Sequence, residues 1–171
     1  MQLIRTIRDA DLGMDVPPPP AYEERRAARA VVFDSDGNIA LLHATKKHYH
    51  KLPGGEIEKG ETIEAALRRE VLEEIGCAIE NLTELGMIEE YRNKLKLYQI
   101  SYCFLAHVVG EKGEQNLEAG ELADGHDPEW LSIEQAIKTL EGESGVEDYE
   151  GKFIQLRDLT FLKAAADLGR E

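Results

Sequence analysis

Short apolar runs of strand length alternate along the chain with segments whose apolar residues recur at helical spacing. Ala27 to Phe33 and Ile39 to Ala44 are two such runs, separated by the turn-forming stretch Asp34-Ser35-Asp36-Gly37-Asn38. Two apolar runs joined by a turn of this composition predict a β-hairpin. Gln2 to Arg8 mixes β-branched and polar residues and predicts a further short strand.

The clearest helical pattern in the first half of the chain covers residues 62–76. Its apolar residues recur at spacings of three and four, which places them on one face of a helix. The residues of this face are Leu67, Val71 and Ile75, widened by Ala65 and Leu72. We expect this face to be buried against a sheet.

The second half of the chain predicts more strands and then two helices. Strands are expected at Glu84 to Tyr91 and at Lys96 to Val109, where Tyr98, Ile100, Tyr102, Phe104 and Ala106 form the more apolar face. A long acidic loop, residues 110–128, leads to a short strand at Glu129 to Leu131. Ser132 is expected to cap a helix that ends at Leu140, and a final helix begins at Asp148 or Glu150 and ends at Leu168.

Strands on both sides of a helix, followed by terminal helices, predict an α/β (α+β) fold with a mixed sheet between helices. The 171 residues fit one domain, 1–171. Within it, residues 1–24 form an N-terminal arm whose four prolines, Pro17 to Pro20, predict an extended linker, and residues 145–171 form the C-terminal helix.

The composition, 42% hydrophobic and 32% charged, is that of an ordinary soluble protein. Its formal net charge of −14 argues against nucleic acid as a partner, because phosphate binding needs clustered basic residues. Cys77 and Cys103 each lie in an apolar stretch, which predicts buried free thiols in a reducing compartment. Without a long apolar segment or a signal peptide, the chain is expected to be cytoplasmic and to have no membrane partner.

The helix predicted at residues 62–76 carries a cluster of acids beside its apolar face. Glu70, Glu73 and Glu74 fall within one turn of each other, where like charges repel. Mg²⁺ binds carboxylate and phosphate oxygens and would offset this repulsion, while Arg69 could hold a carboxylate in place. The alternative is a solvated acidic face that binds nothing.

Basic residues flank the glycine turn Pro53-Gly54-Gly55, which lets the backbone approach a ligand closely. Lys51, directly before this turn, and Arg29, inside a strand of small residues, are the candidates for substrate contact, together with Gly54. His48 and His50 are a weak zinc signal, because a spacing of two without a third soft ligand is not specific.

From Gly55 the chain reads glycine, five residues, Glu61, seven residues and then Arg69-Glu70-Val71-Leu72-Glu73-Glu74-Ile75-Gly76-Cys77. This resembles the Nudix box, Gly-x5-Glu-x7-Arg-Glu-U-x-Glu-Glu-x-Gly-U, in which U is a bulky aliphatic residue. Every polar and glycine position matches, and Leu52-Pro53-Gly54-Gly55 before it is also typical of the family. The one departure is Cys77 at the last U, a small apolar residue that should pack there.

The Nudix resemblance implies an α/β/α sandwich and a metal-dependent pyrophosphohydrolase acting on a nucleoside diphosphate linked to another group. Carried over by position, Glu73 and Glu74 are metal ligands, Glu70 is a ligand or base, and the Gly55 carbonyl is a further ligand. Arg69 orients these acids, and Glu61 caps or braces the loop. A further glutamate is expected from the acidic loop, Glu121 first and Glu118 second. Mg²⁺ is the expected cofactor, with Mn²⁺ able to substitute.

The substrate expected from this resemblance is a small nucleotide, by default a nucleoside triphosphate, ordinary or oxidised. ADP-ribose and nucleotide sugars are the alternatives, and a homodimer is left open. A Nudix-like module that binds a ligand without cleaving it would keep the fold and lose the chemistry, although the intact box argues against it. A purely structural acidic protein is the remaining alternative.

Overall fold

The computed structural model describes residues 1–143 and 146–169. The strands among them are β1 (Leu3–Arg8), β2 (Glu23–Phe33), β3 (Ile39–Ala44), β4 (Tyr49–Lys51), β5 (Gly54–Glu56), β6 (Ala78–Arg92), β7 (Leu97–Val109) and β8 (His126–Leu131). The helices are α1 (Ile63–Ile75), α2 (Ala119–Asp124), α3 (Ile133–Gly142) and α4 (Tyr149–Leu168), with the short 3₁₀ turns η1 (Asp9–Leu12) and η2 (Asn93–Leu95).

The described strands form one mixed sheet in the order β1-β6-β7-β2-β3-β4, with β5 paired to β2 and β8 paired to β3. Strand β2 pairs in parallel with β7 along its whole length, from Glu23 to Phe33. At its C-terminal end it turns into β3, which runs antiparallel to it, so the predicted hairpin is confirmed. The N-terminal arm adds β1 to the edge of the sheet, parallel to β6.

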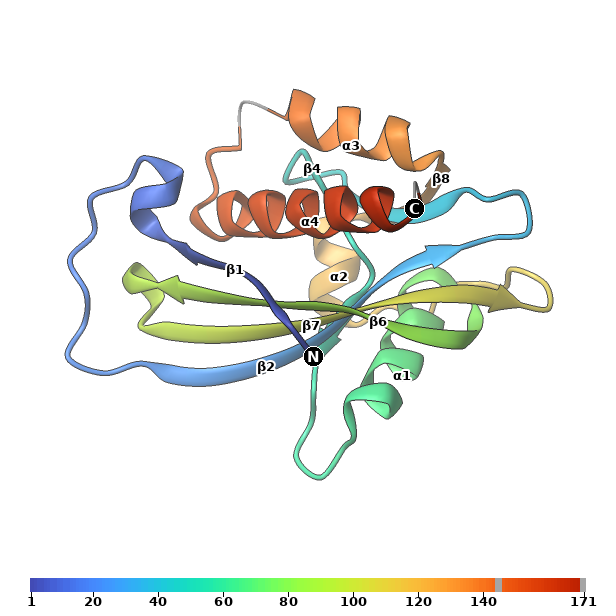
Figure 1. The fold of residues 1–171 in the computed structure, drawn as a ribbon, viewed down its shortest axis with the longest axis horizontal. Helices are drawn as coiled ribbons and strands as arrows, with labels where there is room; N and C mark the ends of the chain where they lie inside the picture. The colour runs from blue at the N-terminus through green and yellow to red at the C-terminus, as the bar shows by residue number, and fades with distance from the viewer. Residues whose placement is uncertain (144–145, 170–171) are drawn as a thin grey trace.

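Helices cover both faces of this sheet, α1 on one side and α3 with α4 on the other (Figure 1). Leu67, Val71 and Ile75 of α1 pack with Val32 and Leu42 of the sheet in one apolar cluster. A second apolar cluster joins the opposite face of the sheet to α3 and α4 through Leu140, Phe153, Phe161 and Leu162. The predicted α/β/α sandwich with a mixed sheet is confirmed.

Several elements extend beyond the apolar runs that predict them. Strand β2 starts at Glu23 instead of Ala27, β6 at Ala78 instead of Glu84, and β8 at His126 instead of Glu129. Backbone pairing causes this extension, because a ladder of hydrogen bonds continues through polar residues wherever a neighbouring strand is present. Lys51 and Gly54 likewise lie in the short strands β4 and β5, where the sequence predicts loop and turn.

Two predictions about buried faces are wrong. Ala65 and Leu72 are exposed, Leu72 by 53%, because α1 presents only a narrow stripe to the sheet. In β7 the expected apolar face is reversed near the N-terminal end, where Gln99 and Ser101 are fully buried and Tyr98 is half-buried. Hydrogen bonds make this burial tolerable, since Gln99 donates to Glu90 at 3.0 Å.

Helix α4 places an ion pair inside the protein. The predicted alternatives for its start are resolved, because Asp148 caps the helix. Phe161 and Leu162 are both buried. Arg157 and Asp158 are also buried, and Arg157 Nε donates to Asp158 Oδ1 at 2.7 Å. The predicted C-terminal segment 145–171 includes residues 145, 170 and 171, which lie outside the described residues.

Cys77 and Cys103 are buried free thiols, as predicted. Across the part of the chain that the structure describes, no helix has the length and hydropathy that a membrane crossing requires.

Candidate active site

The candidate site is organised by α1, whose ends are fixed by local chemistry. Thr62 caps the helix by accepting a hydrogen bond from the Ala65 N–H at 3.2 Å. Gly76 ends it in the left-handed conformation, with φ of 67°, and its N–H donates to the Leu72 carbonyl. The two ends of α1 therefore fix the position of the acidic turn from Glu70 to Glu74 relative to the glycine turn.

Gly54 and Gly55 allow two close approaches that a side chain would prevent. A Cβ atom at Gly54 would collide with the Ala28 carbonyl oxygen, and one at Gly55 would collide with the Glu70 carboxylate. Gly54 also has φ of 131°, which residues with a Cβ rarely adopt. The two glycines thus let β5 lie against β2 and against the acids of α1.

We expect Gly54→Ala to lower the free energy of unfolding by about 3 to 5 kcal/mol, because the new Cβ meets immobile backbone. Gly60→Ala is the matched control. Gly60 also has positive φ, 85°, but no atom of the described residues lies within 4 Å of the position that a Cβ would take there. It should cost only about 1 to 2 kcal/mol. Urea unfolding of the metal-free proteins measures both, and equal losses would contradict the packing argument.

Arg69 links the acids of α1 to the loop before it. Its Nε and Nη2 donate to the two oxygens of Glu61, each at 3.0 Å, and its Nη1 donates to Glu70 at 2.7 Å and to Glu73 at 3.3 Å. Nη2 also reaches the Glu56 carbonyl at 3.1 Å. Hydrogen bonding to Glu61 is the main cause of the raised pKa of Arg69, and the same bonds lower the pKa of Glu61.

Glu74 is the most buried acid of the helix, with its side chain only 1% exposed. Its carboxylate accepts from the Gly54 N–H at 2.5 Å and from Lys51 Nζ at 3.0 Å. One ligand atom from each of Glu74, Glu121 and His126 lies within 4.8 Å of the other two. The helix, β8 and the acidic loop therefore converge at Glu74.

The long acidic loop forms a helix at its C-terminal end and is anchored to α1, where the sequence predicts only a loop. The Asn116 N–H donates to the Glu73 carbonyl at 2.8 Å, and Gln115 Nε2 donates to the Glu74 carbonyl at 2.6 Å. The loop then forms α2, in which the Glu121 carboxylate accepts from the Glu118 N–H at 2.9 Å. These contacts explain how residues distant in sequence reach the glutamates of α1.

Glu121 and His126 have shifted pKa values in this setting. Burial raises the pKa of Glu121 to about 7, and the negative charge of Glu74 adds to the effect. Burial also lowers the pKa of His126 to about 4, with the charge of Lys51 in support, so this imidazole is neutral at pH 7. Its Nδ1 has no hydrogen-bond partner within the described residues.

Arg29 is almost fully buried in β2 and donates from Nη1 to the Gly54 carbonyl. Burial, with the nearby charge of Arg157, lowers its pKa to about 10, so it remains a cation at neutral pH. Its Nε has no hydrogen-bond partner in the described part of the chain. A buried cation with spare donor capacity is suited to an anionic ligand.

These groups surround a cavity of about 320 Å³. Its lining residues are mostly charged: Arg25, Arg29, Lys51, Gly54, Gly55, Glu56, Glu58, Arg69, Glu70, Glu74, Glu118 and Glu121. A second cavity of about 270 Å³ shares five of these residues and extends to Tyr49, His126 and Arg157. Both cavities are of a size that suits small ligands.

The structure brings most of the predicted site residues together. Arg29, Lys51, Gly54, Gly55, Arg69, Glu70, Glu74 and Glu121 all line the first cavity. Glu73 is not among the lining residues, and its carboxylate faces Arg69 instead. Glu118, the second choice in the loop, lines both cavities beside Glu121.

Several lining residues were not predicted from the sequence, and Arg25, His126 and Arg157 are the three that matter most for the chemistry of the site. Arg157 had a signal, since a charged pair, Arg157-Asp158, interrupts the apolar face of the final helix. Arg25 belongs to the pair Arg25-Arg26 just before the predicted strand, which is also a readable signal. No feature of the sequence singled out His126, because a single histidine in a polar loop is not distinctive.

The residues of the first cavity fit a divalent cation. Burial raises the pKa of Glu70, and the charge of Glu74 contributes further. The pKa of Glu121 is raised by the same two causes. Carboxylates that repel each other in a buried place favour either a proton or a metal ion. The donors are mostly oxygens, and neutral His126 lies next to them, which is the chemistry of a divalent metal site.

The sequence profile of the NUDIX domain matches residues 23–150, which is more than half of the chain. The chain belongs to the Nudix family. This match includes the box and all the acids that line the cavity, and it begins at the first residue of β2.

Individual relatives of this Nudix chain carry different names. It is 35% identical over 111 residues to a NAD-capped RNA hydrolase of Haemophilus influenzae, a match that covers 61% of this chain and 38% of that protein. It is 30% identical over 122 residues to an ADP-ribose pyrophosphatase of Methanocaldococcus jannaschii, covering 69% of each. An oxidized purine nucleoside triphosphate hydrolase of Danio rerio is 32% identical over 83 residues, covering 48% of each.

Solved structures agree with the fold. A NUDIX hydrolase from Nitrosomonas europaea superposes with a TM-score of 0.59 at 20% identity, covering 80% of this chain and 92% of that one. At this identity the likeness supports the α/β/α architecture alone.

Proposed function

We propose that this chain is an enzyme that hydrolyses the pyrophosphate bond of a nucleoside diphosphate linked to another group. The observation that carries this proposal is that acidic and basic side chains line the same cavity, the first of the two. Glu70, Glu74 and Glu121 offer oxygens to a divalent cation on one side, and Arg29 and Lys51 face the same space. A diphosphate needs both kinds of partner, because its own charge must be offset without excluding the metal.

The metal set proposed for this site follows the box. Glu70, Glu73, Glu74, Glu121 and the Gly55 carbonyl would hold Mg²⁺ or Mn²⁺, with Glu73 released from Arg69 as the ion binds. When bound, such an ion supplies Lewis-acid stabilisation of phosphate oxygens and an acidified water.

The basic residues position the substrate in this proposal. Lys51, Arg29 and Arg25 all line the cavity and would donate to phosphate oxygens of the substrate. Arg69 keeps Glu61 and Glu70 in fixed orientations through bonds of 2.7 to 3.0 Å. The adjoining cavity with Tyr49 and Arg157 offers space for the group linked to the diphosphate.

A nucleoside triphosphate, ordinary or oxidised, is the proposed substrate, with ADP-ribose or a nucleotide sugar as the alternative. The relatives support the class of substrate and not one member, because the three named activities occur at similar identities, 30 to 35%. The predicted lack of nucleic-acid binding stays a prediction, and the capped-RNA relative makes a capped RNA a necessary member of any panel. The cytoplasmic location and the open homodimer also stay predictions.

A panel of nucleoside triphosphates, oxidised triphosphates, ADP-ribose, nucleotide sugars, NAD and NAD-capped RNA, assayed with Mg²⁺, tests the proposal. A triphosphate should yield a monophosphate and pyrophosphate, and ADP-ribose should yield AMP and ribose phosphate. EDTA should abolish either reaction. If the panel members bind but none is cleaved with Mg²⁺ or Mn²⁺, the chain is a ligand-binding module instead.

Mg²⁺ alone should raise the melting temperature. An ion that binds only the native state stabilises it by mass action, about 2.7 kcal/mol at one hundred times its dissociation constant. Relief of the repulsion between Glu74 and Glu121 is the structural source of this stabilisation. Thermal scans with EDTA and with millimolar Mg²⁺ measure it, and no shift, even with a non-hydrolysable nucleotide present, would favour a merely solvated acidic face.

A further inference from the structure

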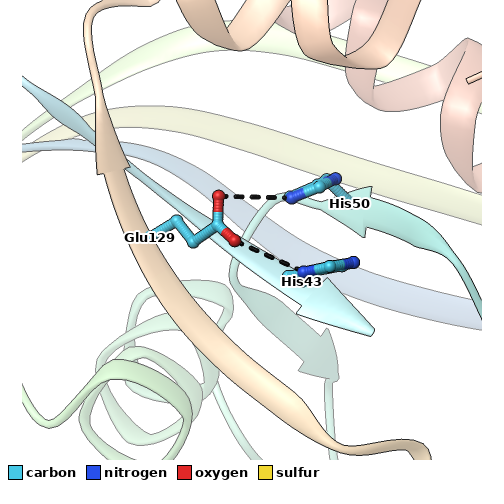
Figure 2. Close-up of side chains that lie close together, drawn as sticks. All are labelled: His43, His50 and Glu129. Carbon is cyan, nitrogen blue, oxygen red and sulfur yellow. Dashed lines mark ion pairs between the residues drawn. The ribbon is translucent and has the colours of Figure 1, made fainter. Parts of the chain in front are cut away.

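A second group of metal-ligating side chains lies away from the cavity. His43, His50 and Glu129 come from three neighbouring strands, β3, β4 and β8, and the Glu129 carboxylate faces both imidazoles (Figure 2). Glu129 Oε1 lies 3.3 Å from His43 Nδ1, and Oε2 lies 3.4 Å from His50 Nε2. One ligand atom from each residue lies within 4.8 Å of the other two.

This group lies on the face of the sheet opposite to Lys51 and Glu74. His43 pairs across the strands with His50, and the neighbouring Leu42 pairs with Lys51. Cross-strand partners share a face and successive residues alternate, so the two histidines point away from the face of Lys51. Lys51 contacts Glu74. The two groups of ligands are therefore separated by the sheet.

His50 is oriented as a metal-bound histidine is. Its ring Nδ1 forms a hydrogen bond with the carboxylate of Glu143 at the C-terminal end of α3. Its backbone N–H donates to the same carboxylate oxygen at 2.9 Å. Metal-binding histidines usually donate their second ring N–H to a carboxylate in this way, which leaves the other nitrogen free for the ion. His50 Nε2 is such an atom, in a residue only 9% exposed, and it has no hydrogen-bond partner within residues 1–143 and 146–169.

The distances favour a shared ion over direct hydrogen bonds. N–H···O bonds are normally about 2.7 to 3.2 Å long, so contacts of 3.3 and 3.4 Å lie beyond the usual range. Ligands about 2.0 to 2.1 Å from a tetrahedral Zn²⁺ lie roughly 3.3 to 3.4 Å from each other. Each of the two nitrogen–oxygen separations, one to each oxygen of Glu129, is close to that edge length.

The two rings stack face to face. The His43 and His50 rings are nearly parallel, 13° apart, with their centres separated by 4.2 Å. A metal ion lies in the plane of each imidazole that binds it, so binding of one ion by both nitrogens requires one of the two rings to rotate.

We propose that His43, His50 and Glu129 form a second metal site, specific for Zn²⁺ or a similar transition-metal ion. Two imidazoles and one carboxylate suit such an ion, whereas Mg²⁺ prefers a shell of oxygens. The side chains of His43 and Glu129 are 31% and 38% exposed, so the fourth ligand position faces solvent. Bound metal ties β8 to β3 and β4, with Glu143 as the positioning residue that holds His50.

Zn²⁺ binding by the full chain tests this site directly. The measurement is calorimetry with Zn²⁺ in millimolar Mg²⁺ and in the Glu74→Gln background, which together suppress Zn²⁺ binding in the carboxylate cavity. We expect one ion per chain. His43→Ala and Glu129→Gln should each weaken binding by at least about 100-fold, and Glu143→Gln by roughly 10- to 100-fold. His43 and Glu129 are partly exposed, so these variants should fold, which circular dichroism checks.

His48→Asn is the matched control, because His48 is an exposed histidine two residues from His50 and outside the group. Its positive φ of 59° is one that asparagine tolerates. This variant should bind Zn²⁺ as the parent does. Co²⁺ in place of Zn²⁺ should give the strong visible absorption of a four-coordinate site, lost in His43→Ala. The proposal is overturned if the parent binds no Zn²⁺ under these conditions, or if His43→Ala and Glu129→Gln bind it unchanged.

Discussion

Glu74→Gln is expected to lower turnover by about 10²- to 10³-fold, a loss typical of removing one group that stabilises charge in a transition state. Glu74 lies at the centre of the contacts in the site. Its carboxylate accepts hydrogen bonds from the Gly54 N–H and from Lys51, and it lies within 4.8 Å of a carboxylate oxygen of Glu121. Glutamine keeps the shape and an oxygen acceptor while it removes the charge that attracts a cation. Because the change also removes the charge that pairs with Lys51, urea unfolding of the metal-free variant accompanies the rate measurements.

Steady-state rates at several Mg²⁺ concentrations, with the best substrate of the panel, measure this loss. Glu64→Gln is the matched control, because Glu64 is an exposed acid on the same helix and lines neither cavity of the site. It should retain the parent rate. Parent activity in Glu74→Gln at saturating Mg²⁺ would show that the acidic turn is not the metal site. Glu73→Gln belongs in the same series, and it tests the predicted ligand whose carboxylate faces Arg69.

The layered fold and the position of α1 could be predicted because their determinants are local in sequence. Leu67, Val71 and Ile75 define a helix face without reference to any other segment, and they are buried as expected. The box adds fixed spacings over residues 55–77, and a family signature carries the tertiary arrangement with it. Elements whose partners lie nearby in sequence, such as the β2–β3 hairpin, were predictable for the same reason.

The errors arise where long-range pairing decides the outcome. Gln99 is buried in β7 because Glu90 lies on the adjacent strand and Arg157 arrives from α4, 58 positions later, within 3.6 Å of Glu90. The alternation of apolar and polar residues along one strand does not predict which polar residue will be buried with a hydrogen-bond partner from another element. Leu72 is exposed for the converse reason, because the sheet covers a narrower stripe of α1 than the apolar residues would allow.

The metal-ligating histidines illustrate the same limit. The sequence draws attention to His48 and His50, which are close in the chain, yet His48 is exposed at a turn and His43 is the residue that stacks on His50. Glu129 joins them only because β8 pairs with β3 in a register that sets it opposite Leu41. Sheet register, and not spacing in the chain, brings these ligands together.

Glu121→Gln should also reduce turnover strongly, by about 10²-fold, if the acidic loop supplies a ligand opposite the box. Glu118→Gln is its control, because Glu118 lines the same cavity and is exposed at the start of α2. Both substitutions keep an oxygen acceptor, so α2 should remain formed. A greater loss in Glu118→Gln would reassign the ligand within the loop, and full activity in both variants would make the loop a structural connection only.

The same substitution should change how the stability of the metal-free protein depends on pH. The pKa of Glu121 is about 7 in the folded protein against an ordinary 4.5, so between these values the folded state binds more protons than the unfolded state. The stabilisation by protonated Glu121 is complete below pH 4.5 and is lost as the pH rises through 7. We expect Glu121→Gln to remove this decline and to be more stable than the parent at pH 8 by about 1 to 2 kcal/mol, allowing for solvent screening. Urea unfolding in EDTA from pH 5 to 8 measures it, and parallel pH profiles for parent and variant would contradict the repulsion between Glu121 and Glu74.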